Sequence, residues 1–165
     1  MKNILVIGVA RSGKSRFSKK FDNYNHIPMD YITSSLKHNF KETNITSNVI
    51  IDKNSSKKLS LLLSHVINIM NDTDELFLID SAHLYPEDIY PYIDTNKWDI
   101  YCLGYPNTTV EDKFNEIRKY DTDKDWTHKR NDDELKDIIS KLIDISKEMK
   151  ESCERLNINF IDTSK

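Results

Sequence analysis

The feature that most constrains this chain is residues 8–15, which read Gly8-Val9-Ala10-Arg11-Ser12-Gly13-Lys14-Ser15, a G-x-x-x-x-G-K-S pattern. An apolar run at 3–7 precedes it and predicts a buried strand, and 15–21 suits a short helix with Phe17 and Phe21 on one face. In this context the glycines let backbone N–H groups curl around an anion, and the helix N-terminus adds its dipole. The pattern therefore predicts a phosphate-binding P-loop that takes a nucleoside triphosphate.

Each polar side chain of this loop has an expected role. Lys14, which is not expected in the core, reaches the β- and γ-phosphates, and the Ser15 hydroxyl holds Mg²⁺. Arg11 either approaches a phosphate or points to solvent, and Arg16 is a candidate for the acceptor side. The residues expected to bind the nucleotide are Gly8, Ala10, Arg11, Ser12, Gly13, Lys14, Ser15 and Arg16.

Composition indicates how many domains to expect and which classes of partner not to expect. With 165 residues, 31% of them charged and 38% hydrophobic, the chain suits one globular domain. A net charge of −3 gives no basic bias, so no nucleic-acid partner is expected. No apolar run approaches ~18 residues, so no membrane partner is expected. The first residues enter a strand without a signal peptide, and Cys102 and Cys153 lie in apolar patterns as buried thiols, so we expect a cytoplasmic location.

Strands and helices alternate along the rest of the chain. Further strands are expected at 25–29, 75–80, 98–104 and 158–162, with Pro28 marking a strand end or sheet edge. Five strands that alternate with helices predict an α/β three-layer sandwich, in which a five-stranded parallel sheet has helices on both faces. The run 49–51 is either a short extra strand or a buried loop anchor.

The helices can be placed from apolar periodicity and capping residues. Ile32, Leu36 and Phe40 form the predicted inner face of a helix over 31–41. Ser55 or Ser56 is the expected N-cap of the next helix, which ends near Met70. Later helices are expected to begin at the capping signatures Thr108-Thr109-Val110-Glu111 and Asn131 with Glu134.

Acidic residues follow two of the strands. Asp80 ends an apolar strand, as in a Walker B sequence, and would orient Mg²⁺ through Ser15 or a bound water. Asp30 follows the 25–29 strand directly. Because the carboxyl ends of parallel strands meet at one sheet edge, the P-loop, Asp30, Asp80 and Thr163 are expected to converge there. The alternatives are that Asp30 caps a helix and that Asp80 merely leaves the core. His83 is either structural, a contact to the acceptor or a base.

The chain resembles the small P-loop kinases, the superfamily of nucleoside monophosphate, shikimate and gluconate kinases, over essentially its full length. The resemblance rests on the 8–15 loop, Asp30, the LFLID strand at 76–80, a basic segment before the last long helix, and the terminal IDTS at 161–164. Residues 79–88, IDSAHLYPED, are also similar to a stretch of kinases related to 2-phosphoglycerate kinase. The superfamily resemblance implies a sheet order of 2-3-1-4-5 and a single kinase domain over 1–165.

The resemblance also implies roles for individual segments. Asp30 would hold an acceptor hydroxyl or a magnesium water, and Thr163 would border the adenine. Residues 31–56 would form the acceptor-binding insert, and 118–132 would form a lid. Lid arginines meet the transferred phosphoryl group or stack on the base in this superfamily, so Arg118 and Arg130 join Lys14, Asp30 and Asp80 as catalytic candidates. The alternative for the lid is a solvated charge run, and Trp126 is a weaker candidate.

The expected function is transfer of the γ-phosphoryl group of ATP or GTP, with Mg²⁺, to a small-molecule acceptor by a monomer or homodimer. One alternative is a nucleoside or nucleotide kinase. The insert contains Lys37, His38 and Lys41 but no arginine pair typical of nucleoside monophosphate binding, which disfavours a nucleotide acceptor. The other alternative is a regulatory P-loop protein that hydrolyses ATP slowly. Asp30 and Asp80 supply the acids that catalysis needs, which favours a kinase.

Overall fold

The strand β1 (Asn3–Gly8) lies at the centre of the sheet, and all six of its residues are buried. It pairs in parallel with β3 (Phe77–Ser81) and β4 (Trp98–Gly104), while β2 (Asn25–Pro28) and β5 (Asn159–Asp162) form the edges. The order β2-β3-β1-β4-β5 confirms the order that the resemblance implied.

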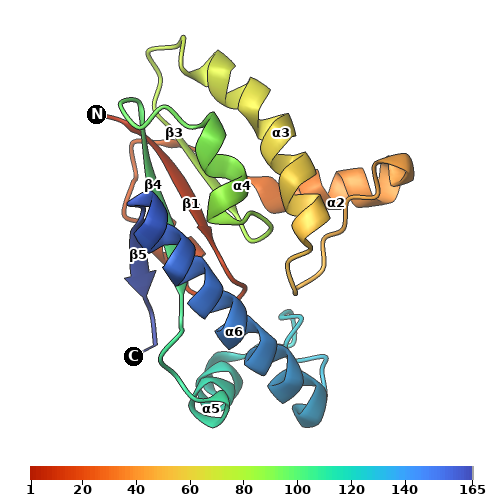
Figure 1. The fold of residues 1–165 in the computed structure, drawn as a ribbon. Coiled ribbons are helices and arrows are strands. Elements are labelled where there is room, and N and C mark those ends of the chain that lie inside the picture. The colour runs from red at the N-terminus through yellow and green to blue at the C-terminus, as the bar shows by residue number, and fades with distance from the viewer. Residues whose placement is uncertain (165) are drawn as a thin grey trace.

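The computed structural model describes residues 1–164. Its helices are α1 (Lys14–Ser18), α2 (Met29–Asn39), η1 (Lys41–Thr43), α3 (Lys53–Met70), α4 (Pro86–Ile89), η2 (Tyr90–Tyr92), α5 (Val110–Tyr120) and α6 (Asp132–Leu156). In Figure 1 the long helix α6 runs diagonally across one face of the sheet, with α3 and α4 on the same side. Within residues 1–164, no helix combines the length and apolar character that a membrane span requires.

Alternation along β1 gives the sheet two apolar faces. Leu5 and Ile7 point into the larger core, which α3, α4 and α6 cover. Ile4 and Val6 point to the other face, where aromatic side chains around α1 pack over them. Phe17 and Phe21 lie there edge to face, with ring centroids 5.5 Å apart. The predicted α/β architecture with helices on both faces is confirmed.

Several local predictions are confirmed. Pro28 ends β2, and β2 is an edge strand, where a missing N–H costs no ladder hydrogen bond. Asn131 caps α6 by accepting a hydrogen bond from Glu134 N. Cys102 and Cys153 are buried free thiols. Residues 49–51 form no strand; Ile51 is buried in the core, so this run is a loop anchor.

The predicted inner face of α2 is wrong for Ile32 and Phe40, whereas Leu36 packs against the core. The helix begins at Met29, two residues earlier than expected, and buries Met29 and Thr33. Ile32 and Phe40 are 39% and 50% exposed. Because Met29 leaves β2 already pointing into the core, it sets which face of the helix turns inward.

Two capping predictions are also wrong. Asp52 caps α3 by accepting from Ser55 N, whereas Ser56 Oγ is engaged with α4, accepting from Tyr85 N at 2.8 Å and donating to Asp88 at 2.7 Å. Thr109, one residue after the predicted cap, caps α5 through Asp112 N. The cap of α3 is therefore an aspartate before the two serines, and the cap of α5 is the second of the two neighbouring threonines.

Candidate functional site

The loop after β1 has the backbone of a curled anion cradle. Gly8, Arg11 and Gly13 have φ of 142°, 60° and 87°, and α1 begins directly after Gly13. A Cβ on Gly8 would lie 2.1 Å from the Leu103 carbonyl oxygen of β4, so only glycine fits there. The glycines therefore allow both the turn and the close approach of β4.

Lys14 lies inside this curl rather than outside the core, which corrects the sequence-based expectation. Its side chain is buried, and Nζ donates to the carbonyl oxygens of Gly8 at 3.0 Å and Val9 at 2.8 Å. Burial lowers the pKa of Lys14 to about 8, although the carboxylates of Asp30 and Asp80 act in the opposite direction. The ammonium group is thus held at the base of the loop in a site that favours an added negative charge.

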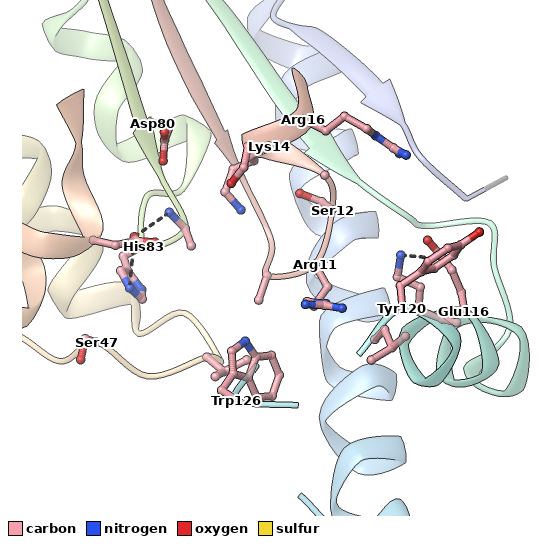
Figure 2. Close-up of a pocket in the computed structure, with 18 of the residues that line it drawn as sticks. Arg11, Ser12, Lys14, Arg16, Ser47, Asp80, His83, Glu116, Tyr120 and Trp126 are labelled. Atoms are coloured by element: carbon pink, nitrogen blue, oxygen red, sulfur yellow. Dashed lines mark hydrogen bonds and ion pairs between the residues drawn. The ribbon is translucent and has the colours of Figure 1, made fainter. Parts of the chain in front are cut away.

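Ser12 and Ser15 supply hydroxyl groups to the same place. Ser12 is 2% exposed, and its Oγ has no hydrogen-bond partner within residues 1–164. An unpaired buried hydroxyl costs about 1–3 kcal/mol, so an oxygen-rich ligand at this point would gain from pairing with it. Ser15 is exposed on the same cavity wall. Figure 2 shows Ser12 and Lys14 around the loop.

A cavity of about 950 Å³ opens in front of this loop. It brings together most of the predicted site residues and several others. Its wall is formed by Ala10, Arg11, Ser12, Gly13, Lys14, Ser15, Arg16, Asp30, Ser34, Ser47, Val49, Asp80, Ala82, His83, Lys113, Glu116, Ile117, Tyr120 and Trp126. Gly8, Thr163, Arg118 and Arg130 lie outside this wall.

Two acids and two histidines lie on β2 and β3 or just after these strands. Asp80 is 8% exposed and its carboxylate is paired with Nε2 of His26 on β2. Asp30 lies 3.7 Å from Nε2 of His83. Burial lowers the pKa of His83, with Lys14 acting in the same direction and Asp30 against it. His83 is therefore neutral at pH 7, next to a carboxylate that faces the cavity.

Asp30 does not cap α2. It lies in the first turn of that helix, whose N-cap position is Pro28 without a side-chain bond. Its Oδ1 accepts a long hydrogen bond from Ala82 N at 3.5 Å. The alternative interpretation of Asp30 as a helix cap is therefore wrong.

Arg11 does not point freely to solvent, and its approach to a phosphate stays a prediction. Its guanidinium donates to Asp125 at 3.1 Å and lies 3.6 Å from Asp121. These acids belong to the segment between α5 and α6. The P-loop is thus tied to the predicted lid by an ion pair.

Arg118 and Arg130 are not brought to the cavity. Arg118 donates to Asp121, to the carbonyl oxygens of Thr127 and Arg130, and to Asp132, at 2.8–3.2 Å. It holds the 121–131 segment in its path, and the Arg130 side chain is exposed. Trp126 is the residue of this segment that lines the cavity.

Thr163 follows β5 outside the cavity wall. Its N–H and its hydroxyl both donate to the Gly104 carbonyl oxygen. These bonds fasten the end of β5 to β4. Any contact to a base at Thr163 stays a prediction.

Sequence reasoning missed three cavity residues on α5: Lys113, Glu116 and Tyr120. Lys113 is 3% exposed, with Nζ 2.9 Å from Glu116 and 4.3 Å from the centre of the Tyr105 ring. Lys113, Ile117 and Tyr120 are spaced at i, i+4 and i+7, which places them on one helix face. This spacing was the signal in the sequence that could have identified them as neighbours. His26 was also missed, because its contact with Asp80 joins different strands.

The residues present fit a magnesium ion that arrives with a nucleotide. No group of three or more His, Cys, Asp or Glu side chains able to hold a metal occurs within residues 1–164. Mg²⁺ usually keeps several waters and takes one or two protein oxygens together with substrate phosphates. The Ser15 hydroxyl and the Asp80 carboxylate, both on the cavity wall, supply that donor set.

Known proteins add no assignment. A scan against models of protein families found no match, and a search of curated proteins found no similar sequence. Function is therefore inferred from the geometry and chemistry of the cavity.

Proposed function

We propose that this chain is a phosphotransferase that binds a nucleoside triphosphate in the P-loop and passes the γ-phosphoryl group to a small acceptor. The observation that carries this proposal is that the curled loop with Lys14 and the carboxylate of Asp30 line the same cavity. A cradle for phosphate and an acid for an acceptor hydroxyl are the two parts that phosphoryl transfer requires.

In the nucleotide part of the cavity, the P-loop N–H groups would bind the β- and γ-phosphates. Lys14 would exchange its bonds to the Gly8 and Val9 carbonyl oxygens for phosphate oxygens, and Ser12 would donate its unpaired hydroxyl. Ser15 and Asp80 would hold Mg²⁺, which neutralises phosphate charge when bound. These interactions would position the γ-phosphoryl group toward Asp30.

In the acceptor part, Asp30 would accept a hydrogen bond from the reacting hydroxyl and then take its proton. His83, neutral because burial lowers its pKa, would donate to Asp30 and orient it. Trp126 lies on the cavity wall and would exclude water from the reacting groups. Asp30 is thus the proposed base and His83 a positioning residue.

A second candidate function is a regulatory nucleotide-binding protein with slow hydrolysis. The Arg11–Asp125 ion pair favours it, because bound phosphate would compete with Asp125 for the Arg11 guanidinium. Nucleotide binding would then release the 121–131 segment. The same ion pair is also compatible with a kinase, in which release of the 121–131 segment would accompany turnover.

The test is ADP formation from Mg·ATP with and without a panel of hydroxyl acceptors. We expect one acceptor class to stimulate turnover, and Lys14→Ala to abolish it. Lys19→Ala is the matched control, since Lys19 is exposed just after α1. Asp30→Asn is expected to lower turnover by about 100-fold or more with little change in nucleotide affinity. Nucleotide binding without stimulation by any acceptor would favour the regulatory function, and turnover that survives Lys14→Ala would contradict both.

A further inference from the structure

The cavity has two chemically different halves. We define the nucleotide half by residues 11–16 with Lys113, Glu116 and Tyr120, and the acceptor half by Asp30, Ser34, Ser47, Val49, Ala82 and His83. In Figure 2, His83 and Ser47 lie on one side and Tyr120 and Glu116 on the other, with Arg11 and Lys14 between them.

All basic side chains on the described wall belong to the nucleotide half. They are Arg11, Lys14, Arg16 and Lys113. Lys113 is paired with Glu116, and Arg11 with Asp125. Arg16 extends away from His83 and Ser47 in Figure 2. Positive charge is therefore placed where the triphosphate is proposed to bind and nowhere on the opposite wall of the described cavity.

The charge of the acceptor half comes from Asp30. The Asp30 side chain is 53% exposed, so its carboxylate faces a ligand directly. Its neighbour His83 is held neutral by burial, which lowers its pKa. The remaining polar groups are the hydroxyls of Ser34 and Ser47. An anionic group here would meet a carboxylate of the same sign, which is costly at a partly desolvated site. Lys14, the wall cation that acts on both Asp30 and His83, is proposed to bind the triphosphate instead.

The basic residues of the 31–56 segment add no positive charge to the acceptor half. Lys37, His38, Lys41 and Lys53 are exposed and lie off the cavity wall. The helix face that points into the cavity presents Ser34 instead. Val49 and Trp126 add an apolar and an aromatic surface for a ligand body.

We infer that the acceptor is an uncharged or cationic hydroxyl compound, and not a phosphorylated or carboxylated one. This inference rests on the proposed phosphotransferase function. In the reaction, the acceptor oxygen forms a bond to the γ-phosphorus, and the bond from that phosphorus to the β–γ bridging oxygen breaks. The electron pair leaves on the nucleoside diphosphate, and the hydroxyl proton passes to Asp30.

The experiment measures binding of matched compounds by calorimetry while the nucleotide half is filled with Mg²⁺ and a non-hydrolysable ATP analogue. The probes are glucosamine, glucitol and gluconate; thymidine and thymidine 5′-monophosphate; and ethanolamine and glycolate. We expect an uncharged or cationic member to bind at least about 10-fold more tightly than its anionic partner, a difference of about 1.4 kcal/mol. ADP formation with ATP should show the same preference.

A charge placed in the acceptor half provides a second test. Ser34→Arg should reduce the discrimination against gluconate and thymidine 5′-monophosphate by about 10-fold. Ser35→Arg is the matched control, because Ser35 is exposed on α2 and lies off the cavity wall. It should leave the discrimination unchanged.

The outcomes separate this inference from the proposed function. Binding of the ATP analogue is measured first, and its absence would contradict the proposed function. If the analogue binds and an anionic probe is preferred, or if no uncharged or cationic probe binds, the inference about the acceptor is overturned while nucleotide binding stands.

Discussion

The Arg11 guanidinium in the P-loop donates a hydrogen bond of 3.1 Å to the carboxylate of Asp125, 114 residues further along the chain. Hydrogen bonds from the N–H and hydroxyl of Thr122 lower the pKa of Asp125, and Arg11 adds to that effect. Asp125 is therefore a charged partner at neutral pH. The pair links the glycine loop after β1 to the 121–131 segment, which carries Trp126 into the cavity.

Loss of this pair should loosen the 121–131 segment. Exposed ion pairs stabilise by up to about 1 kcal/mol, so Arg11→Ala is expected to speed amide hydrogen exchange there by roughly two- to fivefold. Arg16→Ala, which changes an exposed arginine of α1, is the control. Mass spectrometry measures the amide exchange rates of this segment. Equal rates in the wild type and in Arg11→Ala would show that the ion pair does not hold the segment.

Arg118 and Arg130 should differ sharply in their effect on stability. The Arg118 side chain is 25% exposed and bonds to four residues, so Arg118→Ala should lower the free energy of unfolding by about 2 kcal/mol. Arg118→Lys should recover only part of this, because an ammonium cannot reproduce the planar fork. Arg130→Ala should stay within about 0.5 kcal/mol of the wild type. Urea unfolding gives the free energy of unfolding of all three variants. Equal losses for Arg118→Ala and Arg130→Ala would show that Arg118 has no special role in holding the 121–131 segment.

The two P-loop glycines should also respond differently to alanine. In Gly8→Ala the new Cβ would meet the Leu103 carbonyl oxygen at 2.1 Å, so we expect a loss of more than about 3 kcal/mol or failure to fold. In Gly13→Ala the nearest atom is 3.7 Å away, and the penalty comes only from φ of 87°. That penalty is about 1–2 kcal/mol. Thermal unfolding of both variants checks the order, and equal losses would show that the close approach of Leu103 does not decide the cost at Gly8.

Nucleotide binding should take up protons near pH 8. Burial lowers the pKa of Lys14 to about 8 in the free protein, and phosphate oxygens beside the ammonium would raise it again. At pH 8 we expect uptake of about half a proton, and above pH 8 an affinity that falls by up to about tenfold per pH unit. Calorimetry in buffers of different ionisation enthalpy measures the uptake. Lys14→Arg keeps the charge without titrating, so uptake that persists in that variant would assign the proton to another group.

Much of the fold follows from local patterns. The apolar runs and the glycine spacing correctly placed β1, the P-loop and β4, and Asn131 with Glu134 marked the start of α6. These features depend on residues within a few positions of one another, so their physical causes are visible in the sequence. The convergence of Asp30 and Asp80 on the P-loop could also be predicted, because strand ends of a parallel sheet share one edge.

The tertiary structure decided what the local patterns left open. Pairing of Arg11 with Asp125, and of His26 with Asp80, joins residues far apart in sequence, and no spacing rule specifies such contacts. The same holds for α2, where burial of Met29 and Thr33 left Ile32 and Phe40 of the predicted apolar face exposed. The sequence by itself determined the curled glycine loop, the parallel sheet and the edge that carries the candidate site. Which side chains line the acceptor half depended on how whole elements pack, because burial of a helix face is a property of the assembled core.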